Sequence, residues 1–133
     1  MNPLQAARGH LAKAQEFLAE AKSALANGHP NAATSNAVIA GINAKVAICL
    51  VLVGETSKAD DHRQAVGELK RAGKIGADVA VTLDRLLKPK TKSQYQSLSM
   101  VMKDAESAVN QAGRLVEEAG HVVPAAEPGE PSR

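Results

Sequence analysis

Apolar residues recur at alternating spacings of three and four positions over the beginning of the chain. A stripe with this spacing lies along one face of an α-helix and packs against neighbouring helices. Asn2 followed by Pro3 is typical of a helix start, and Asn27-Gly28 with Pro30 after it is typical of a helix end. The stripe consists of Leu4, Ala7, Leu11, Ala14, Leu18, Ala21 and Leu25. The pattern therefore predicts one long helix that ends before Gly28.

The next segment is different, because almost every position from Ala37 to Val53 is apolar. We expect a helix that begins near Asn31 to Thr34 and ends at Gly54, since length and alanine content favour a helix over a buried strand. A helix that is apolar on every face must be surrounded, so it is either the central helix or a helix at an interface. The run is at the lower limit of a membrane span and contains polar residues. We interpret it as a core helix and expect no membrane contact.

A third helix is predicted to start in the capping patterns between Ser57 and Gln64. Its apolar stripe continues to Lys88, and interior glycines predict a kink or a split near Gly73 to Gly76. Pro89 is expected to end this helix. A polar connection from Lys90 to Leu98 is expected to follow.

A last helix is expected from Met100 to Ala119, closed by Gly120. The segment from Pro124 to Arg133 is rich in proline and lacks apolar periodicity, so we expect it to be disordered. These elements predict one all-α domain over residues 1–123. Its architecture is an antiparallel up-and-down bundle of four helices, or of five where the third is split.

Composition narrows the possible chemistry. The chain has 133 residues and one cysteine, Cys49, which excludes an internal disulfide and favours a reducing compartment, so we expect a cytoplasmic protein. The N-terminus carries no recognisable secretory signal. No HExxH, CxxC, P-loop or GxSxG motif is present. We therefore expect no metal and no cofactor.

The densest polar cluster lies at the predicted start of the third helix, where Asp60, Asp61, His62 and Arg63 are consecutive. Two carboxylates beside an imidazole are able to act as a general base or to hold a metal. Carboxylates at a helix start also satisfy free backbone N–H groups and suit the helix dipole. The cluster is thus either a cap or a site, and His62 is the residue to test.

Charge is unevenly distributed along the chain, although the formal net charge is only +2. Basic residues outnumber acidic ones between His62 and Lys92, and such a segment is able to follow phosphates. Interleaved aromatic residues that would stack on bases are missing, so a solvated basic face is the alternative. The candidate nucleic-acid contacts are Lys70, Arg71, Lys74, Lys88, Lys90 and Lys92.

Two polar residues, Asn43 and Lys45, interrupt the apolar second helix. If they are buried they need partners, because an unpaired amide or ammonium group costs several kcal/mol. An asparagine in a helical seam is able to fix the pairing of a dimer. The alternative is that both residues reach the least covered edge of the helix. Either case allows a homodimer with Asn43 and Lys45 at its interface.

Several short sequence segments occur in a characteristic order along the chain. They are Leu18–Lys22 with Gly28, Asn31–Ala40 before the apolar helix, Asp60–Val66, Leu83–Leu87 leading to Lys92–Tyr95, and Asp104-Ala105 before Ala112 and Leu115–Glu117. In this order and spacing, over roughly Leu4 to Ala119, the chain resembles the HEPN-domain family. These are small all-helical proteins of prokaryotic toxin–antitoxin and defence systems.

The resemblance implies a bundle of four to five helices that is commonly dimeric and often works beside a nucleotidyltransferase or another nucleic-acid-related partner. Many members are ribonucleases with an R-x4-6-H motif. No arginine lies four to six positions ahead of a histidine, so we expect a variant that lacks this motif. Lys92 and Tyr95 fall where the family often has an Arg-to-Tyr segment.

The leading hypothesis is therefore a non-catalytic, self-associating HEPN-like module that serves a nucleic-acid-linked system, such as toxin–antitoxin, defence or a mobile element, with RNA as a possible ligand. The first alternative is a degenerate ribonuclease built from Asp61, His62, Arg63, Lys92 and Tyr95. The second is a structural module whose apolar helix binds a helix of a protein partner.

Overall fold

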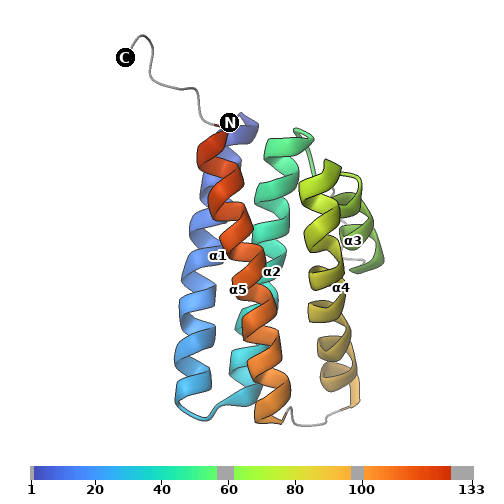
Figure 1. Cartoon of the computed structure of the whole chain (residues 1–133). Helices are drawn as coiled ribbons and strands as arrows, with labels where there is room; N and C mark the ends of the chain where they lie inside the picture. The colour runs from blue at the N-terminus through green and yellow to red at the C-terminus, as the bar shows by residue number, and fades with distance from the viewer. Residues whose placement is uncertain (1, 57–61, 97–100, 127–133) are drawn as a thin grey trace.

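The computed structural model describes residues 2–56, 62–96 and 101–126, with side chains for all of these except 62 and 89–96. The described residues form five helices and no strand (Figure 1). The helices are α1 (Pro3–Ala26), α2 (Pro30–Leu52), α3 (His62–Lys70), α4 (Gly73–Gln96) and α5 (Met102–Ala125). The predicted all-α bundle is confirmed, with the third predicted helix present as two.

Helix α1 begins and ends where its local signals predict. The Asn2 side chain accepts a hydrogen bond from the backbone N–H of Gln5 at 2.8 Å, and the Gln5 side chain accepts one from the Asn2 backbone at 3.3 Å. This reciprocal capping box satisfies two donors that a helix start leaves free. At the other end, Gly28 has a φ of +75°, which suits glycine and turns the chain toward α2.

Helix α2 is the central helix. It packs against each of the other four helices, and in Figure 1 it lies behind α5, with α1 on one side and α4 on the other. Its buried face is rich in alanine, and at Gly41 the side chains of Leu86 and Leu115 come so close that a Cβ would overlap Leu86. By length and composition alone α2 could cross a membrane, but in this fold it lies in the core.

The third predicted helix is split into α3 and α4 by a sharp corner. Gly73 adopts a φ of +85° there, and Gly76 lies so close to the end of α3 that a Cβ would overlap the backbone oxygen of Leu69. The prediction that Pro89 ends the helix is wrong, because α4 continues to Gln96. A proline inside a helix removes one backbone donor, and the residues on both sides of it remain helical. The expected polar connection is therefore helical through Gln96.

Helix α5 is longer than predicted. Gly120 lies inside it, and Val122 and Val123, which are 6% and 1% exposed, hold a further turn against the core. Pro124 and Ala125 belong to this last turn, so the predicted disordered segment does not begin at Pro124. Burial of two valines outweighs the low helix propensity of the glycine. Residues 127–133 lie outside the described part of the chain.

Candidate functional site

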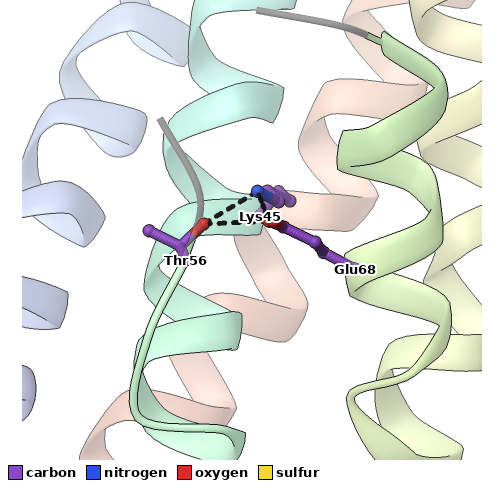
Figure 2. Close-up of polar contacts among 3 residues, drawn as sticks. All are labelled: Lys45, Thr56 and Glu68. Carbon is purple, nitrogen blue, oxygen red and sulfur yellow. Dashed lines mark hydrogen bonds and ion pairs between the residues drawn. The ribbon is translucent and has the colours of Figure 1, made fainter. Parts of the chain in front are cut away.

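A buried ion pair joins α2 to α3 (Figure 2). Lys45 of α2 is 3% exposed, and its Nζ donates to Glu68 Oε1 of α3 at 2.5 Å and to Thr56 Oγ1 at 2.8 Å. Thr56 also donates to Glu68 Oε1 at 3.3 Å. A buried ammonium group needs such partners, because burial of an unpaired charge is very costly. These three residues, named here the Lys45 cluster, hold α3 against the central helix.

A cavity of about 370 Å³ adjoins the Lys45 cluster and is lined by Cys49, Val53, Glu55, Thr56, Glu68 and Arg71. Burial raises the pKa of the Cys49 thiol, and the nearby Glu68 adds to this effect, while Lys45 and Arg71 oppose it. The thiolate is the reactive form of cysteine. The raised pKa therefore favours the protonated, less reactive form of Cys49.

Asn43 is also paired within the chain. Its Oδ1 lies 2.8 Å from Nδ1 of His10 in α1, and its Nδ2 donates to the backbone oxygen of Ile39 at 2.9 Å. Asn43 and Lys45 thus both have intramolecular partners, and neither needs a second copy of the chain to satisfy it. A dimer interface at Asn43 and Lys45 stays a prediction, with Lys45 enclosed in the core of one chain.

The predicted degenerate ribonuclease site lies largely outside the described side chains, so it stays a prediction. Asp61 lies outside the described residues, and no side chain is described for His62, Lys92 or Tyr95. Arg63 is exposed and has an interaction partner. At about 1.5 Å per residue, the backbone of His62 lies roughly 12 Å along α3 from the corner with α4. The backbone of Tyr95 lies roughly 33 Å along α4 from the same corner, so the two residues are at different levels of the bundle.

The predicted basic residues form two groups. Lys70, Arg71 and Lys74 are exposed and surround the turn between α3 and α4; we name them the basic corner. Lys88 lies further along α4, where its Nζ forms a surface ion pair with Asp84 at 2.9 Å. Lys90 and Lys92 belong to the last turns of α4, without described side chains. Among the described side chains, the corner is the part of the predicted surface that the fold brings together.

A groove of about 490 Å³ lies between α1 and α5. Its lining comes from both helices: Gln15, Leu18, Lys22, Val109, Asn110, Gly113, Arg114, Val116 and Glu117. The predicted basic segment gave no indication of this groove, because the two cations that line it, Lys22 and Arg114, lie far apart in the sequence. Antiparallel packing of the two helices (Figure 1) brings them to one groove.

Arg114 and His121 of α5 have six residues between them, so they fit the R-x4-6-H spacing. The expectation that this motif is missing is corrected, because the spacing counts intervening residues and places the arginine seven positions ahead of the histidine. Both side chains are exposed. Seven residues make about two turns, so the pair shares one face of α5 at a separation of roughly 10 Å along the axis. Among residues with described positions, no group of three His, Cys, Asp or Glu is placed to hold a metal ion.

Comparison with known proteins agrees with this architecture. No curated protein matches the chain. The HEPN domain family, in contrast, matches residues 7–122, which includes all of α2, α3 and α4 and most of α1 and α5. The matched region contains the Lys45 cluster, the basic corner, the α1–α5 groove and the Arg114–His121 pair. The chain therefore belongs to the HEPN-domain family.

Proposed function

We propose that this chain is a self-associating HEPN binding module that contacts nucleic acid through the basic corner and serves as an accessory in a toxin–antitoxin, defence or mobile-element system. The observation that supports this proposal is the exposure of Lys70, Arg71 and Lys74 around one tight turn. The nearest acid of α3, Glu68, is bound to Lys45. Its charge is therefore already compensated within the core.

Three cations at one corner give a weak, salt-dependent contact with a phosphate backbone. Each phosphate that a lysine or arginine neutralises releases counterions, and for single strands the salt slope is about 0.7 per phosphate. Neutralisation of three phosphates therefore gives a slope of log affinity against log salt of about −2. Residues 62–88, which include the basic corner, contain no Phe, Trp or Tyr that would stack on bases, so we expect little sequence preference.

Fluorescence anisotropy with a labelled single-stranded RNA at low salt tests the proposal. The double variant Lys70→Glu/Lys74→Glu is expected to lose most of the binding, whereas Lys13→Glu/Lys103→Glu makes the same charge change at exposed positions of α1 and α5 and should retain it. Equal binding by both variants would refute the basic corner as the contact surface.

Self-association is tested separately by light scattering on the purified chain over a range of concentrations. A concentration-dependent dimer supports the module, and a monomer at every concentration contradicts it. If a stoichiometric second protein, such as a nucleotidyltransferase, co-purifies with the chain and RNA does not bind, the chain functions through a protein contact and not through a nucleic-acid contact.

A ribonuclease is the second candidate, favoured by the Arg114–His121 spacing. An exposed imidazole is able to transfer protons near neutral pH, and an arginine is able to stabilise the charge that develops on a phosphate. The chain should then degrade RNA in a reaction that Arg114→Gln and His121→Ala each abolish. RNA left intact by the wild-type chain, or cleaved equally by both variants, would eliminate this candidate.

A further inference from the structure

The cavity beside the Lys45 cluster carries charges of both signs. It lies between the end of α2 and the end of α3, and we name it the α2–α3 cavity. Two carboxylates, those of Glu55 and Glu68, and the guanidinium of Arg71 line it. Glu68 is already held by Lys45 and Thr56, whereas Glu55 is exposed just after the end of α2. The cavity therefore presents a carboxylate and a guanidinium that a ligand is able to reach.

The guanidinium of Arg71 folds back along α3. Gly67 precedes Arg71 by four residues, and a Cβ on Gly67 would lie 3.2 Å from Nη1 of Arg71. The glycine thus leaves room for the guanidinium to lie against the helix, where it lines the cavity. Burial raises the pKa of the Cys49 thiol, and the positive charge of Arg71 is close enough to oppose this rise. Arg71 is therefore the cation of the basic corner that faces α2.

The apolar wall of the cavity comes from the end of α2. Cys49 and Val53 are four residues apart, so they lie one above the other on the same side of the helix, and both line the cavity. A protonated thiol behaves as a small apolar group, and Val53 is 52% exposed. A short aliphatic chain placed on this wall would remove apolar surface from water.

These groups restrict the class of ligand. A phosphate or another inorganic anion would meet Arg71, but it would also meet the carboxylates of Glu55 and Glu68. Among residues with described positions, no group of three His, Cys, Asp or Glu is placed to hold a metal ion. The volume of about 370 Å³ is near the lower end of the range for small-molecule sites, roughly 300–1,000 Å³. A small molecule with a carboxylate, an ammonium group and an aliphatic chain satisfies all three kinds of lining.

We propose that the α2–α3 cavity binds a free α-amino acid with a small aliphatic side chain. The carboxylate of the ligand pairs with Arg71, whose planar guanidinium suits a carboxylate. The ammonium group of the ligand pairs with Glu55, and its side chain lies on Cys49 and Val53. The Lys45 cluster keeps its own hydrogen bonds and forms the fixed wall behind the ligand.

Occupation of the cavity also affects RNA binding, a link that rests on the proposed function. Arg71 belongs both to the basic corner and to the lining of the cavity, so a guanidinium that holds a carboxylate is withdrawn from a phosphate. By linkage, RNA and the amino acid should weaken each other by the same factor. With the amino acid bound, two of three phosphate contacts remain, so the slope of log affinity against log salt should change from about −2 to about −1.4.

Titration of the isotope-labelled full chain with L-valine, followed by backbone amide chemical shifts, tests the site. The amides of Cys49, Val53 and Arg71 are expected to shift along one common saturation curve. L-Valinamide lacks the carboxylate and N-acetyl-L-valine lacks the ammonium group. Each is expected to bind at least tenfold more weakly, because each loses one charge-assisted contact. Glycine, which lacks the aliphatic side chain, should also bind more weakly than valine.

Substitutions of the two charged partners test their roles. Arg71→Gln and Glu55→Gln are each expected to weaken L-valine binding about tenfold or more, as loss of a charge-assisted bond does. The matched controls Arg85→Gln in α4 and Glu106→Gln in α5 remove the same charges at exposed positions and should bind as the wild-type chain does. The amide spectrum of each variant shows in the same experiment that the variant is folded.

Three results would overturn the inference. These are no shift of the lining amides up to about 10 mM L-valine, a concentration at which a millimolar site is largely occupied; equal binding of valine and its two analogues; and unchanged binding by both Arg71→Gln and Glu55→Gln. An RNA affinity that is the same with and without saturating valine would refute the link through Arg71. Valine binding without RNA binding by the wild-type chain would support the cavity and refute the basic corner, so the two failures are distinguishable.

Discussion

Replacement of Glu68 by glutamine is the sharpest test of how α3 is held. Glutamine keeps the size of the side chain and an oxygen that accepts from Lys45, so the variant removes chiefly the negative charge. Removal of one partner from a buried ion pair typically costs about 3–5 kcal/mol. The Glu68 side chain is 17% exposed, which lets water reach the orphaned ammonium group. We therefore expect a loss of about 2–4 kcal/mol in the free energy of unfolding.

The opposite substitution should cost less. Lys45→Met leaves a carboxylate that still accepts from Thr56 and retains access to water, so we expect about 1–2 kcal/mol. The double variant Lys45→Met/Glu68→Gln removes both charges and should lie closer to the wild-type chain than Glu68→Gln alone does. This non-additivity is the signature of direct coupling between the two side chains.

Urea unfolding measures these differences, provided that the slope with denaturant is unchanged. The exposed Asp84–Lys88 pair, whose side chains are 43% and 74% exposed, supplies the matched control, and Asp84→Asn should cost at most about 0.5 kcal/mol. Amide exchange in α3 should accelerate in Glu68→Gln more than exchange in α1. If Glu68→Gln costs no more than Asp84→Asn, the Lys45 cluster does not hold α3.

Three further predictions concern packing, titration and capping. Gly113→Ala should raise the free energy of unfolding by about 1 kcal/mol, because alanine favours the helix and meets no neighbour. Gly76→Ala should lower it by several times that amount, because its Cβ would overlap the Leu69 backbone. Thermal unfolding compares the two variants, and stabilisation by Gly76→Ala would contradict the described corner. Because burial raises the pKa of Cys49 above its ordinary value of 9.0, the unfolded thiol ionises first, so the free energy of unfolding should fall as the pH rises above about 9. This decline should be smaller in Cys49→Ala, and an equal decline in both chains would exclude the thiol as its source. Asn2→Ala removes the capping box and should lower the free energy of unfolding by about 1 kcal/mol. Thermal unfolding measures this loss, with Asn2→Ser as the conservative control. An equal loss in both variants would show that the side-chain oxygen of Asn2 does not stabilise the helix start.

Local signals predicted those elements whose ends depend on local hydrogen bonds and backbone conformation. Asn2 and Gly28 fix the ends of α1 through a cap and a positive φ, and both causes are visible in a few consecutive residues. The end of α5 depends instead on burial of Val122 and Val123 against the bundle. That burial outweighs the low helix propensity of Gly120 and Pro124. It depends on neighbours that are distant in the sequence.

The same distinction applies to the sites. A lysine inside an apolar helix predicts a partner, but not which one, and only the fold places Glu68 beside Lys45. The cations of the α1–α5 groove, Lys22 and Arg114, are about ninety positions apart and come to line one groove only through the antiparallel pairing that is common in helical bundles. The Arg114–His121 spacing, in contrast, is a property of the sequence alone.

The central position of α2 has a consequence for synthesis of the chain on the ribosome. Synthesis proceeds from the N-terminus, so α1 and α2 are complete while α5, which packs along α2, is still to be made. During that interval an apolar helix long enough to cross a membrane is covered on one side only. The face of α2 that α5 covers in the folded bundle thus stays exposed until α5 has been made.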